Sequence, residues 1–300
     1  MIISKCPLRV SLVGGSTDLQ EFIDKFGKGS VISFPVNLYT YITLNKNIYS
    51  NAYKINYSTT EETLNPNKIK NDIAREVIKH FNLPPIIMSF NSDIPSSGSG
   101  LASSSSYLIA CISAACKFIN KDLPQSEICK LALKLERKFN PLTGYQDPYG
   151  CGIGGLKKYN FYKNQITQEL LSSSVIDDYN LYLIPTKIKR SSTKILSTLD
   201  LDKSHSLLDL VIKLKNNINN EEGFFRAFNK GWENKKSSSS SISTPELLEV
   251  ESKIKNKYDI KGIKLCGAGG GGYFLVFTKD TIKEGNLVEI DNLGVQSWKI

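Results

Sequence analysis

Histidine and paired cysteines are scarce in this sequence. Only two of its 300 residues are histidine, and the six cysteines are scattered without a CxxC pair. Structural zinc sites take cysteine and histidine at short, regular spacings, so a zinc site is not indicated, and neither is a disulfide framework. Because free cysteine is usually buried, we expect the thiols to lie in or near the core. They are Cys6, Cys111, Cys116, Cys129, Cys151 and Cys266.

Long hydrophobic runs are also missing. No segment approaches the ~18 to 20 uninterrupted apolar residues needed to cross a bilayer. The first residues, MIISKCPLRV, lack the basic segment, apolar run and small-residue cleavage site of a secretory signal. We therefore expect a cytoplasmic protein with no membrane partner.

A basic arm is absent as well, although the formal net charge is +9. Lysine and arginine are spread along the chain with acidic residues between them. A nucleic-acid-binding protein, the competing interpretation, would collect them on one face together with aromatic residues that stack on bases. We expect no nucleic-acid partner, since a diffuse positive field equally suits small anions such as phosphorylated metabolites.

The hydrophobic residues, 40% of the chain, supply a large core, and 300 residues favour two domains. Period-two apolar segments alternate with amphipathic helical ones, and the pattern restarts after Gly155. We therefore predict an α+β protein with an N-terminal domain of residues 1–170 and a C-terminal domain of residues 171–300. The expected strands are 8–13, 31–44, 86–92, 156–162 and 181–185, with one more on each side of 267–272. The expected helices are 66–82, 107–118, 126–139, 191–199, 207–216, 224–236 and 245–258.

A serine- and glycine-rich stretch, IPSSGSGLASSSS, precedes the helix expected at 107–118. Glycine and serine leave backbone N–H groups accessible, and the N-terminus of a helix attracts anions, so this loop is typical of an anion cradle. The hydroxyls of Ser103 and Ser104 are also suitable oxygen ligands for Mg²⁺. A serine N-cap with no ligand is the simpler alternative, and the pattern alone favours neither.

The sequence GAGGGG at 267–272 lies between two expected strands. It does not fit the dinucleotide-binding fingerprint, which leads from a strand into a helix, and the chain has no Walker A loop. Small residues in a row indicate close approach to a ligand or to another backbone, but a plain glycine turn explains them equally well.

Two acidic residues stand out by their positions. Glu136 falls near the end of an expected helix, where a carboxylate opposes the helix dipole and calls for a cation, with Arg137 and Lys138 as the simplest partners. Asp147 precedes Pro148, an arrangement typical of a helix N-cap, and a catalytic carboxylate is the alternative.

Three blocks in order resemble the motifs of the GHMP kinases, the superfamily of galactokinase, homoserine kinase and mevalonate kinase. They are PLRVSLVGGSTDL (7–19), PSSGSGLASSS (95–105) and KLCGAGGGGYF (264–274). The similarity runs along essentially the whole chain. It looks closest to the heptose 7-phosphate kinases through GGSTDL, GYQDPYG, GWENKK and the final GVQSWKI.

The resemblance implies an N-terminal domain like domain 2 of ribosomal protein S5, a ferredoxin-like C-terminal domain, and a site for ATP and Mg²⁺ between them. It implies that Asp147 is the catalytic carboxylate with Arg9 beside it, and that Ser104 and Glu136 bind Mg²⁺. The loop residues implied to wrap the ATP phosphates are Ser96, Ser97, Gly98, Ser99, Gly100, Leu101, Ala102, Ser103, Ser104 and Ser105.

On the substrate side, the resemblance implies that Asp18 binds sugar hydroxyls. The neighbouring contacts are expected from Gly14, Gly15, Ser16, Thr17, Gly267, Ala268, Gly269 and Gly270. For a distal phosphate, the candidates are Arg190, Lys235 and Lys236, with solvated surface charge as the alternative. Two departures from the family pattern concern backbone shape, because Ser16 and Ala102 stand where relatives have glycine.

The implied reaction is transfer of a phosphoryl group from ATP to the anomeric hydroxyl of a heptose 7-phosphate, in bacterial surface-glycan (lipopolysaccharide or capsule) precursor synthesis. Another GHMP sugar kinase, like fucokinase or galactokinase, is the main alternative. A non-catalytic sugar or nucleotide sensor on the same fold would be expected to lose Arg9, Glu136 or Asp147, and all three are present. Both a monomer and a homodimer remain open.

Overall fold

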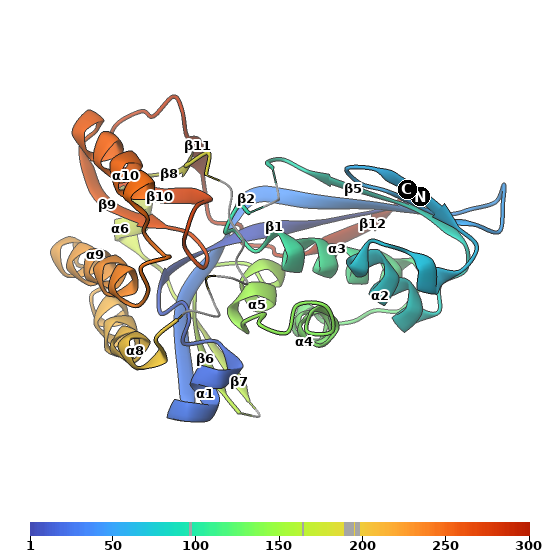
Figure 1. The fold of residues 1–300 in the computed structure, drawn as a ribbon, viewed down its shortest axis with the longest axis horizontal. Coiled ribbons are helices and arrows are strands. Elements are labelled where there is room, and N and C mark those ends of the chain that lie inside the picture. The colour runs from blue at the N-terminus through green and yellow to red at the C-terminus, as the bar shows by residue number, and fades with distance from the viewer. Residues whose placement is uncertain (96–97, 164, 189–194, 196–198) are drawn as a thin grey trace.

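Two β-sheets with helices packed against them organise the chain (Figure 1). The structure, a computed structural model, describes residues 1–95, 98–163, 165–188, 195 and 199–300. Most helices associated with the larger sheet lie together on one of its faces, and the smaller sheet lies at the other end of the molecule with its own helices.

The larger sheet has the strand order β12-β1-β2-β5-β3-β4, and β6 and β7 extend it from the first half of β2. Only β3 and β5 pair in parallel; the other described pairs are antiparallel. Its strands are β1 (Ile2–Val13), β2 (Lys28–Lys46), β3 (Tyr53–Asn56), β4 (Thr60–Thr63), β5 (Ile86–Ser92), β6 (Lys157–Tyr162), β7 (Ile166–Leu170) and β12 (Gln296–Lys299). The associated helices are α1 (Gln20–Phe26), η1 (Pro66–Lys68), α2 (Asp72–Phe81), α3 (Ser103–Phe118), α4 (Gln125–Glu136) and α5 (Gln146–Gly152).

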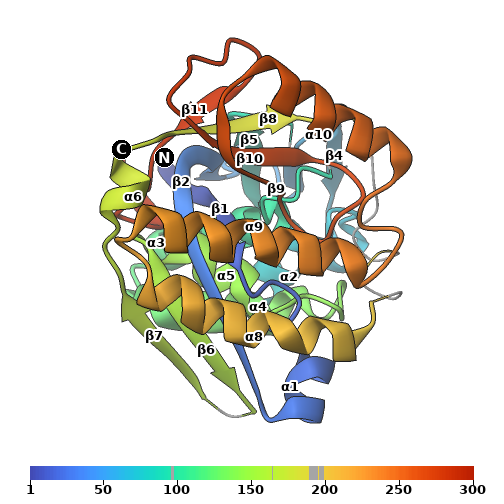
Figure 2. The same cartoon turned by 90° about the vertical axis from the view of Figure 1, so that its left-hand side faces the viewer.

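The smaller sheet is antiparallel throughout, in the order β11-β8-β10-β9. Figure 2 shows α8 and α9 side by side, with α9 near β9. The strands are β8 (Asn180–Pro185), β9 (Ile260–Leu265), β10 (Tyr273–Thr278) and β11 (Asn286–Val288). The helices are α6 (Ser174–Asp177), α8 (Leu201–Asn216), α9 (Glu221–Ser237) and α10 (Pro245–Lys257).

One apolar cluster joins the two halves. Leu8, Val10 and Leu12 of β1 pack in the same buried cluster as Phe228 of α9 and Leu275 of β10. Burial of such side chains is the main source of stability. The two sheets are therefore held in one arrangement, and the space between them has fixed walls.

Several expected elements shift for local reasons. The helix expected at 66–82 begins only at Asp72, because the Asn71 side chain accepts a hydrogen bond from the Ala74 N–H and caps it there. The glycine-containing segment after residue 144 contains α5, which is not among the helices expected above. The helix expected at 191–199 falls almost entirely outside the described residues. The domain boundary at 170/171 stays a prediction. β12 belongs to the predicted C-terminal domain by its position in the chain, but it pairs with β1 in the larger sheet.

All six cysteines are buried and free, as expected. Among the described residues, no helix has the length and apolar character required to cross a membrane.

Candidate active site

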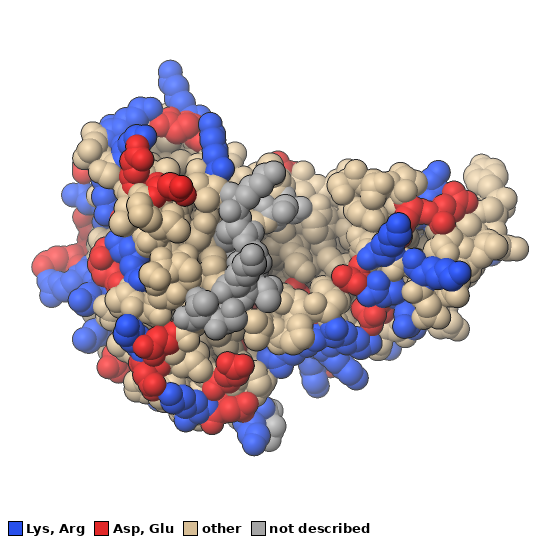
Figure 3. Space-filling view, in the orientation of Figure 1, with Lys and Arg blue, Asp and Glu red and all other residues tan. Residues whose placement is uncertain are grey.

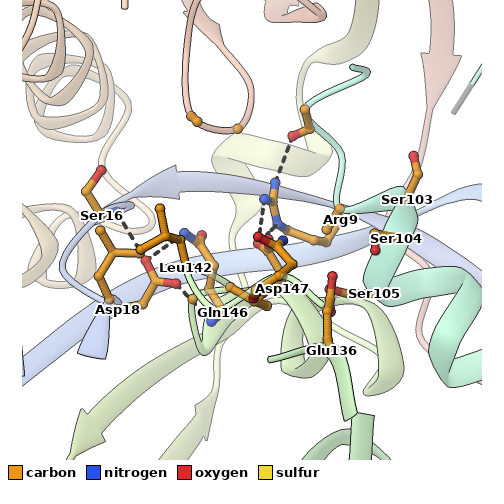
Figure 4. A pocket seen from close by; sticks show the side chains of 18 of the residues that line it. Arg9, Ser16, Asp18, Ser103, Ser104, Ser105, Glu136, Leu142, Gln146 and Asp147 are labelled. Atoms are coloured by element: carbon orange, nitrogen blue, oxygen red, sulfur yellow. Dashed lines mark hydrogen bonds and ion pairs between the residues drawn. The ribbon is translucent and has the colours of Figure 1, made fainter. Parts of the chain in front are cut away.

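A cavity of about 180 Å³ opens where the three sequence motifs meet. Figure 3 shows the hollow between the two halves of the molecule, and Figure 4 shows the side chains around the cavity. Its walls come from β1 and the turn after it, from the loop before α3, from the α4–α5 connection, and from α9 and the turn after β9. Sequence positions more than 250 residues apart thus line one space.

Arg9 and Asp147 form a buried ion pair in this cavity. The Arg9 guanidinium donates from Nη2 to Asp147 Oδ1 at 2.6 Å and from Nε to the same oxygen at 3.0 Å. Its Nη1 donates to the Gly100 carbonyl at 3.0 Å. The Arg9 side chain is 4% exposed, whereas that of Asp147 is 28% exposed, so the carboxylate keeps a face toward the cavity. The pair raises the Arg9 pKa, which keeps the guanidinium charged despite its burial.

The N-cap interpretation of Asp147 is wrong. The residue before α5 is Tyr145, and Asp147 lies inside the first turn of the helix, with its side chain on Arg9. Pro148 is tolerated there because the N–H groups of a first turn have no intrahelical partner. Asp147 is thus free of a capping role.

The serine-glycine loop leads into α3 without a side-chain cap. The N-cap residue is Ala102, which sits in the left-handed region at φ 60°, and no side chain accepts from the first turn. The serine N-cap interpretation is therefore wrong. Gly98 and Gly100 also have positive φ, at 70° and 79°. The uncapped N–H groups and the positive end of the helix dipole face the cavity and suit an anion.

The predicted loop residues divide into three groups. Those that line the cavity are Gly98, Ser99, Gly100, Ala102, Ser103, Ser104 and Ser105. Leu101 does not line it, because its side chain is fully buried and its carbonyl accepts from the Arg9 N–H. Ser96 and Ser97 lie outside the described residues.

Glu136 is a buried carboxylate at the cavity wall. It accepts hydrogen bonds from the hydroxyls of Ser105, at 2.5 Å, and Ser104. Burial raises its pKa to about 7. The two simplest partners do not reach Glu136. Lys138 pairs with Glu76 at 2.9 Å, and the Arg137 guanidinium lies over the Tyr145 ring. Within the described part of the chain Glu136 has no ion-pair partner, so its carboxylate is available to a cation.

Asp18 lies at the end of the cavity opposite Glu136, where the turn after β1 and helix α5 hold it in place. Its carboxylate accepts from the Ser16 N–H at 3.1 Å, the Gln146 N–H at 3.1 Å and Gln146 Nε2 at 2.8 Å. Burial, with the nearby Asp147 charge as the next cause, raises the Asp18 pKa to about 6. Figure 4 shows Gln146 between Asp18 and Asp147.

The rest of this turn is mostly structural. Thr17 is fully buried and donates to the carbonyls of Gly14 and Ser30. A Cβ on Gly14 would lie 2.1 Å from the Ser30 carbonyl oxygen. Ser16 lines the cavity, and a Cβ on Gly15 would lie 3.6 Å from Lys235 Nζ, at the edge of the site. Gly14, Gly15 and Thr17 do not line the cavity, contrary to expectation.

The C-terminal wall carries Lys235, Gly267 and Ala268. Lys235 is 6% exposed, and its Nζ donates to the Gly267 carbonyl at 2.6 Å. Gly269 and Gly270 do not line the cavity. They approach other chain segments instead, since a Cβ on Gly269 would lie 2.8 Å from the Ile242 Cα.

The two remaining phosphate candidates have different outcomes. Lys236 points elsewhere, because its Nζ pairs with Glu233 at 2.7 Å and lies over the Trp232 ring. The structure therefore removes it from the cavity. Arg190 lies outside the described residues.

Several residues of the site were missed from the sequence, among them Leu19, Asn140, Leu142 and Thr143 of the cavity lining. Gln146 and Gly144 line the cavity, and both stand beside Asp147 in GYQD, a signal that was available. Lys264 is 4% exposed, and its Nζ donates to the Ser11 carbonyl at 2.6 Å. Burial, and then the Lys235 charge, lower its pKa to about 7. A lysine within a β-strand gives no signal that it will be buried.

The uncapped helix, the ion pair and the carboxylates suit a small-molecule kinase, and the comparisons with known proteins show that class. The GHMP kinases N-terminal domain matches residues 67–155. The chain is 30% identical, over 347 aligned positions, to D-glycero-alpha-D-manno-heptose 7-phosphate kinase of Campylobacter jejuni, covering 100% of this chain and 99% of that one. The chain therefore belongs to the GHMP kinase family and is an ATP-dependent kinase.

Solved structures confirm the predicted GHMP kinase fold. A D-glycero-D-manno-heptose 1-phosphate kinase from Bacteroides thetaiotaomicron has a TM-score of 0.78 at 22% identity, covering 100% of this chain and 99% of that one. Galactokinase of Lactococcus lactis, complexed with galactose, has a TM-score of 0.78 at 15% identity, covering 100% and 95%. At these identities the likeness concerns the fold alone.

Proposed function

We propose that this kinase phosphorylates the anomeric hydroxyl of D-glycero-D-manno-heptose 7-phosphate and forms the 1,7-bisphosphate. The observation that carries the proposal is the Arg9–Asp147 pair, which leaves the Asp147 carboxylate facing a cavity bordered by an uncapped helix N-terminus. The full-length relative from Campylobacter jejuni supports the choice of sugar by its name.

In the proposed mechanism, Asp147 accepts or orients the proton of the attacking hydroxyl. Phosphoryl transfer needs alignment and charge stabilisation more than covalent help from the protein. Arg9 holds the Asp147 carboxylate at 2.6 Å and also binds the Gly100 carbonyl, so one guanidinium links the acid to the phosphate loop. Its charge stabilises the negative charge that spreads over the transferred group.

The ATP phosphates are proposed to lie against the loop of residues 98–105. Its backbone N–H groups and the start of α3 provide donors, and no side chain of the loop carries a competing negative charge. Mg²⁺ fits beside them, because Ser104 offers an exposed hydroxyl and Glu136 a buried carboxylate with no ion pair among the described residues. When bound, Mg²⁺ would neutralise phosphate charge through these two oxygen ligands.

The distal phosphate of the sugar is assigned to Lys235. It is the predicted phosphate-binding lysine that lines the cavity, and its Nζ is fixed on the Gly267 carbonyl. Arg190 stays a candidate on the basis of the sequence. Asp18, at the same end, is proposed to bind sugar hydroxyls.

The test is incubation of the purified protein with ATP, Mg²⁺ and a panel of sugars and sugar 7-phosphates, followed by phosphorus NMR. We expect a new anomeric phosphate on the heptose 7-phosphate. Preferred transfer to L-fucose or galactose would instead assign another sugar specificity. Absence of transfer to every sugar would refute the sugar-kinase proposal.

A further inference from the structure

The residues just before the catalytic carboxylate are built around Asp18. A Cβ on Gly144 would lie 2.1 Å from Asp18 Oδ2, so only glycine leaves room for the carboxylate. The Tyr145 N–H donates to the Asp18 carbonyl at 3.1 Å. Gln146 then donates twice, from its backbone and from its side chain. The tetrapeptide GYQD therefore surrounds Asp18 and ends on Asp147.

The orientation of the Gln146 amide is imposed by this carboxylate. Its Nε2 donates to Asp18 Oδ1, while its Oε1 is buried and has no partner among the described residues. Rotating the amide by 180° would place Oε1 against the carboxylate oxygen, where two acceptors repel each other. A buried acceptor without a partner is destabilising and calls for an explanation. Here the unpartnered Oε1 results from the amide orientation that places the Nε2 donor on Asp18.

The Asp18 carboxylate retains capacity for a ligand. An ionised carboxylate offers about four acceptor positions, and the chain fills three of them. Two of those three donors act on Oδ1, so Oδ2 keeps a position that no described residue fills, and both Asp18 and Gln146 line the cavity. One hydroxyl donor of a bound sugar therefore matches what remains.

We propose that Gln146 is a substrate-positioning residue, whose side-chain amide holds Asp18 ionised and oriented to accept one hydroxyl of the acceptor sugar. This rests on the proposed function for the identity of the sugar. The proposal adds a residue that determines how tightly that sugar binds. This residue, Gln146, immediately precedes Asp147 in the chain. Gln146 does not itself act on the reacting atoms.

The charges around Asp18 explain why a donor is needed. Burial and the negative charge of Asp147 favour the protonated carboxyl, whereas the backbone hydrogen bonds and the Arg9 charge favour the ionised form. The Gln146 Nε2 donor at 2.8 Å acts in the same direction. Lys235 Nζ also lies near this end, 3.6 Å from a Cβ placed on Gly15. With an Asp18 pKa of about 6, removal of one donor moves the midpoint toward neutral pH, where the enzyme must bind sugar.

The test compares Gln146→Met, Gln146→Glu and, as a matched control on the exposed side of β7, Gln168→Met. We expect Gln146→Met to raise the Michaelis constant for the sugar by ~10- to 100-fold, as expected for a lost hydrogen bond to a charged group, with the constant for ATP unchanged. The acid limb of kcat/KM for the sugar should move to higher pH. At pH 5, below the Asp18 pKa of about 6, the protein should be as stable as the wild type, because the unpartnered Oε1 disappears as well.

Gln146→Glu separates positioning from packing. The glutamate has nearly the same shape but donates only when protonated, so its sugar affinity should be poor at pH 8 and recover partly as the pH falls toward 6. An unchanged Michaelis constant and pH profile in Gln146→Met would overturn the proposal. So would equal losses in both variants at all pH values together with lowered stability, which would indicate a packing role.

A readout without substrate keeps this proposal distinct from the sugar assignment. The Asp18 carboxyl can be titrated by carbon NMR on aspartate-labelled protein, with its signal identified by Asp18→Asn. Gln146→Met should raise the Asp18 pKa and Gln168→Met should not. If the titration shifts while no sugar is phosphorylated, the substrate proposal fails and only the link between Asp18 and Gln146 stands. If it does not shift, the positioning role fails whatever the sugar is.

Discussion

The two walls of the cavity carry opposite charge and are stabilised in different ways. The wall built by the larger sheet and its helices presents Asp18, Glu136 and Asp147, and only Asp147 has an ion-pair partner among the described residues. The wall from the smaller sheet presents Lys235, with Lys264 behind it. Burial raises the pKa of Asp18 and Glu136 and lowers that of Lys264, so each wall holds charge at a cost in stability.

Because of this difference in charge, the two walls suit different parts of the ligands. The acidic wall suits a metal ion and hydroxyl protons, and the basic wall suits phosphate, so neither wall binds a phosphorylated sugar and a nucleotide alone. Charges that destabilise the free protein become favourable when the complementary ligand arrives. Residues of this kind trade stability for activity.

The most severe disruption of the acidic wall is Asp147→Asn. It keeps the shape but removes the base and the ion pair with Arg9, so we expect turnover to fall by ~10² to 10⁴. Steady-state kinetics of the folded variant measures this. Asp209→Asn, at an exposed position of α8, is the matched control and should keep full turnover. Full turnover in Asp147→Asn would remove this residue from the mechanism.

Glu136→Gln separates the stability of the acidic wall from its function. The wild-type Glu136 pKa is raised in the folded state to about 7 from 4.5, so ionisation costs stability as the pH rises from 4.5 to 7. Above pH 7 the variant should be more stable by up to about 3 kcal/mol, with no difference below pH 4. Urea unfolding at pH 4, 6 and 8 checks the sign.

The same variant should need more Mg²⁺ for activity, because one of its two proposed oxygen ligands loses its charge. A Mg²⁺ titration of initial rates measures this requirement. An unaltered Mg²⁺ dependence would show that Glu136 does not hold the ion, even if the stability difference is found.

Lys235→Met and Lys236→Met compare two neighbouring lysines of α9, of which only Lys235 lies on the basic wall. Lys235 faces the cavity, while Lys236 pairs with Glu233. Lys235→Met should raise the Michaelis constant for the sugar 7-phosphate by ~10- to 100-fold, the usual value of a hydrogen bond to a charged group. The unphosphorylated sugar should be affected less, and Lys236→Met should leave both constants near the wild-type values. Equal effects on both sugars would place the distal phosphate elsewhere.

The smallest expected effect concerns backbone strain on the acidic wall. Ser16 and Ala102 adopt φ values of 83° and 60°, in the left-handed region that favours glycine. Because a side chain is disfavoured there, Ser16→Gly and Ala102→Gly should each stabilise the protein by up to about 1 kcal/mol. Gly27→Ala calibrates the scale: φ is 79° with open space around it, so it should lose about 1 kcal/mol. Destabilisation by Ala102→Gly would mean that the packing of its methyl group outweighs the strain.

Much of this fold was predictable because its signals are local or carried by motifs. The strand, glycine turn and strand around 267–272 and the helix starting at Pro245 lie where the pattern places them. Arg9, Asp147 and Ser104 were found through motif resemblance and meet in one cavity. Helix starts were misplaced where a polar side chain decides the boundary, as Asn71 does.

The remaining errors come from tertiary contacts. Adjacent lysines in one helix look alike in sequence, yet Lys235 and Lys236 face different partners, because the rotation of α9 against the smaller sheet decides which reaches the cavity. Gly269 and Gly270 are needed for close packing of the chain against itself rather than for a ligand. The bonds between Gln146 and Asp18 span 128 residues, so no local pattern contains them.

The buried thiols are distributed over both halves of the protein, so their rates of alkylation report how often each half opens. Cys6, Cys111 and Cys151 lie with the larger sheet and its helices, and Cys266 follows β9 in the smaller one. Pulsed alkylation followed by peptide mass spectrometry would report how fast each part exposes its sulfur atoms. Simultaneous labelling would identify a single cooperative unit, and earlier labelling of Cys266 would identify a C-terminal half that opens by itself.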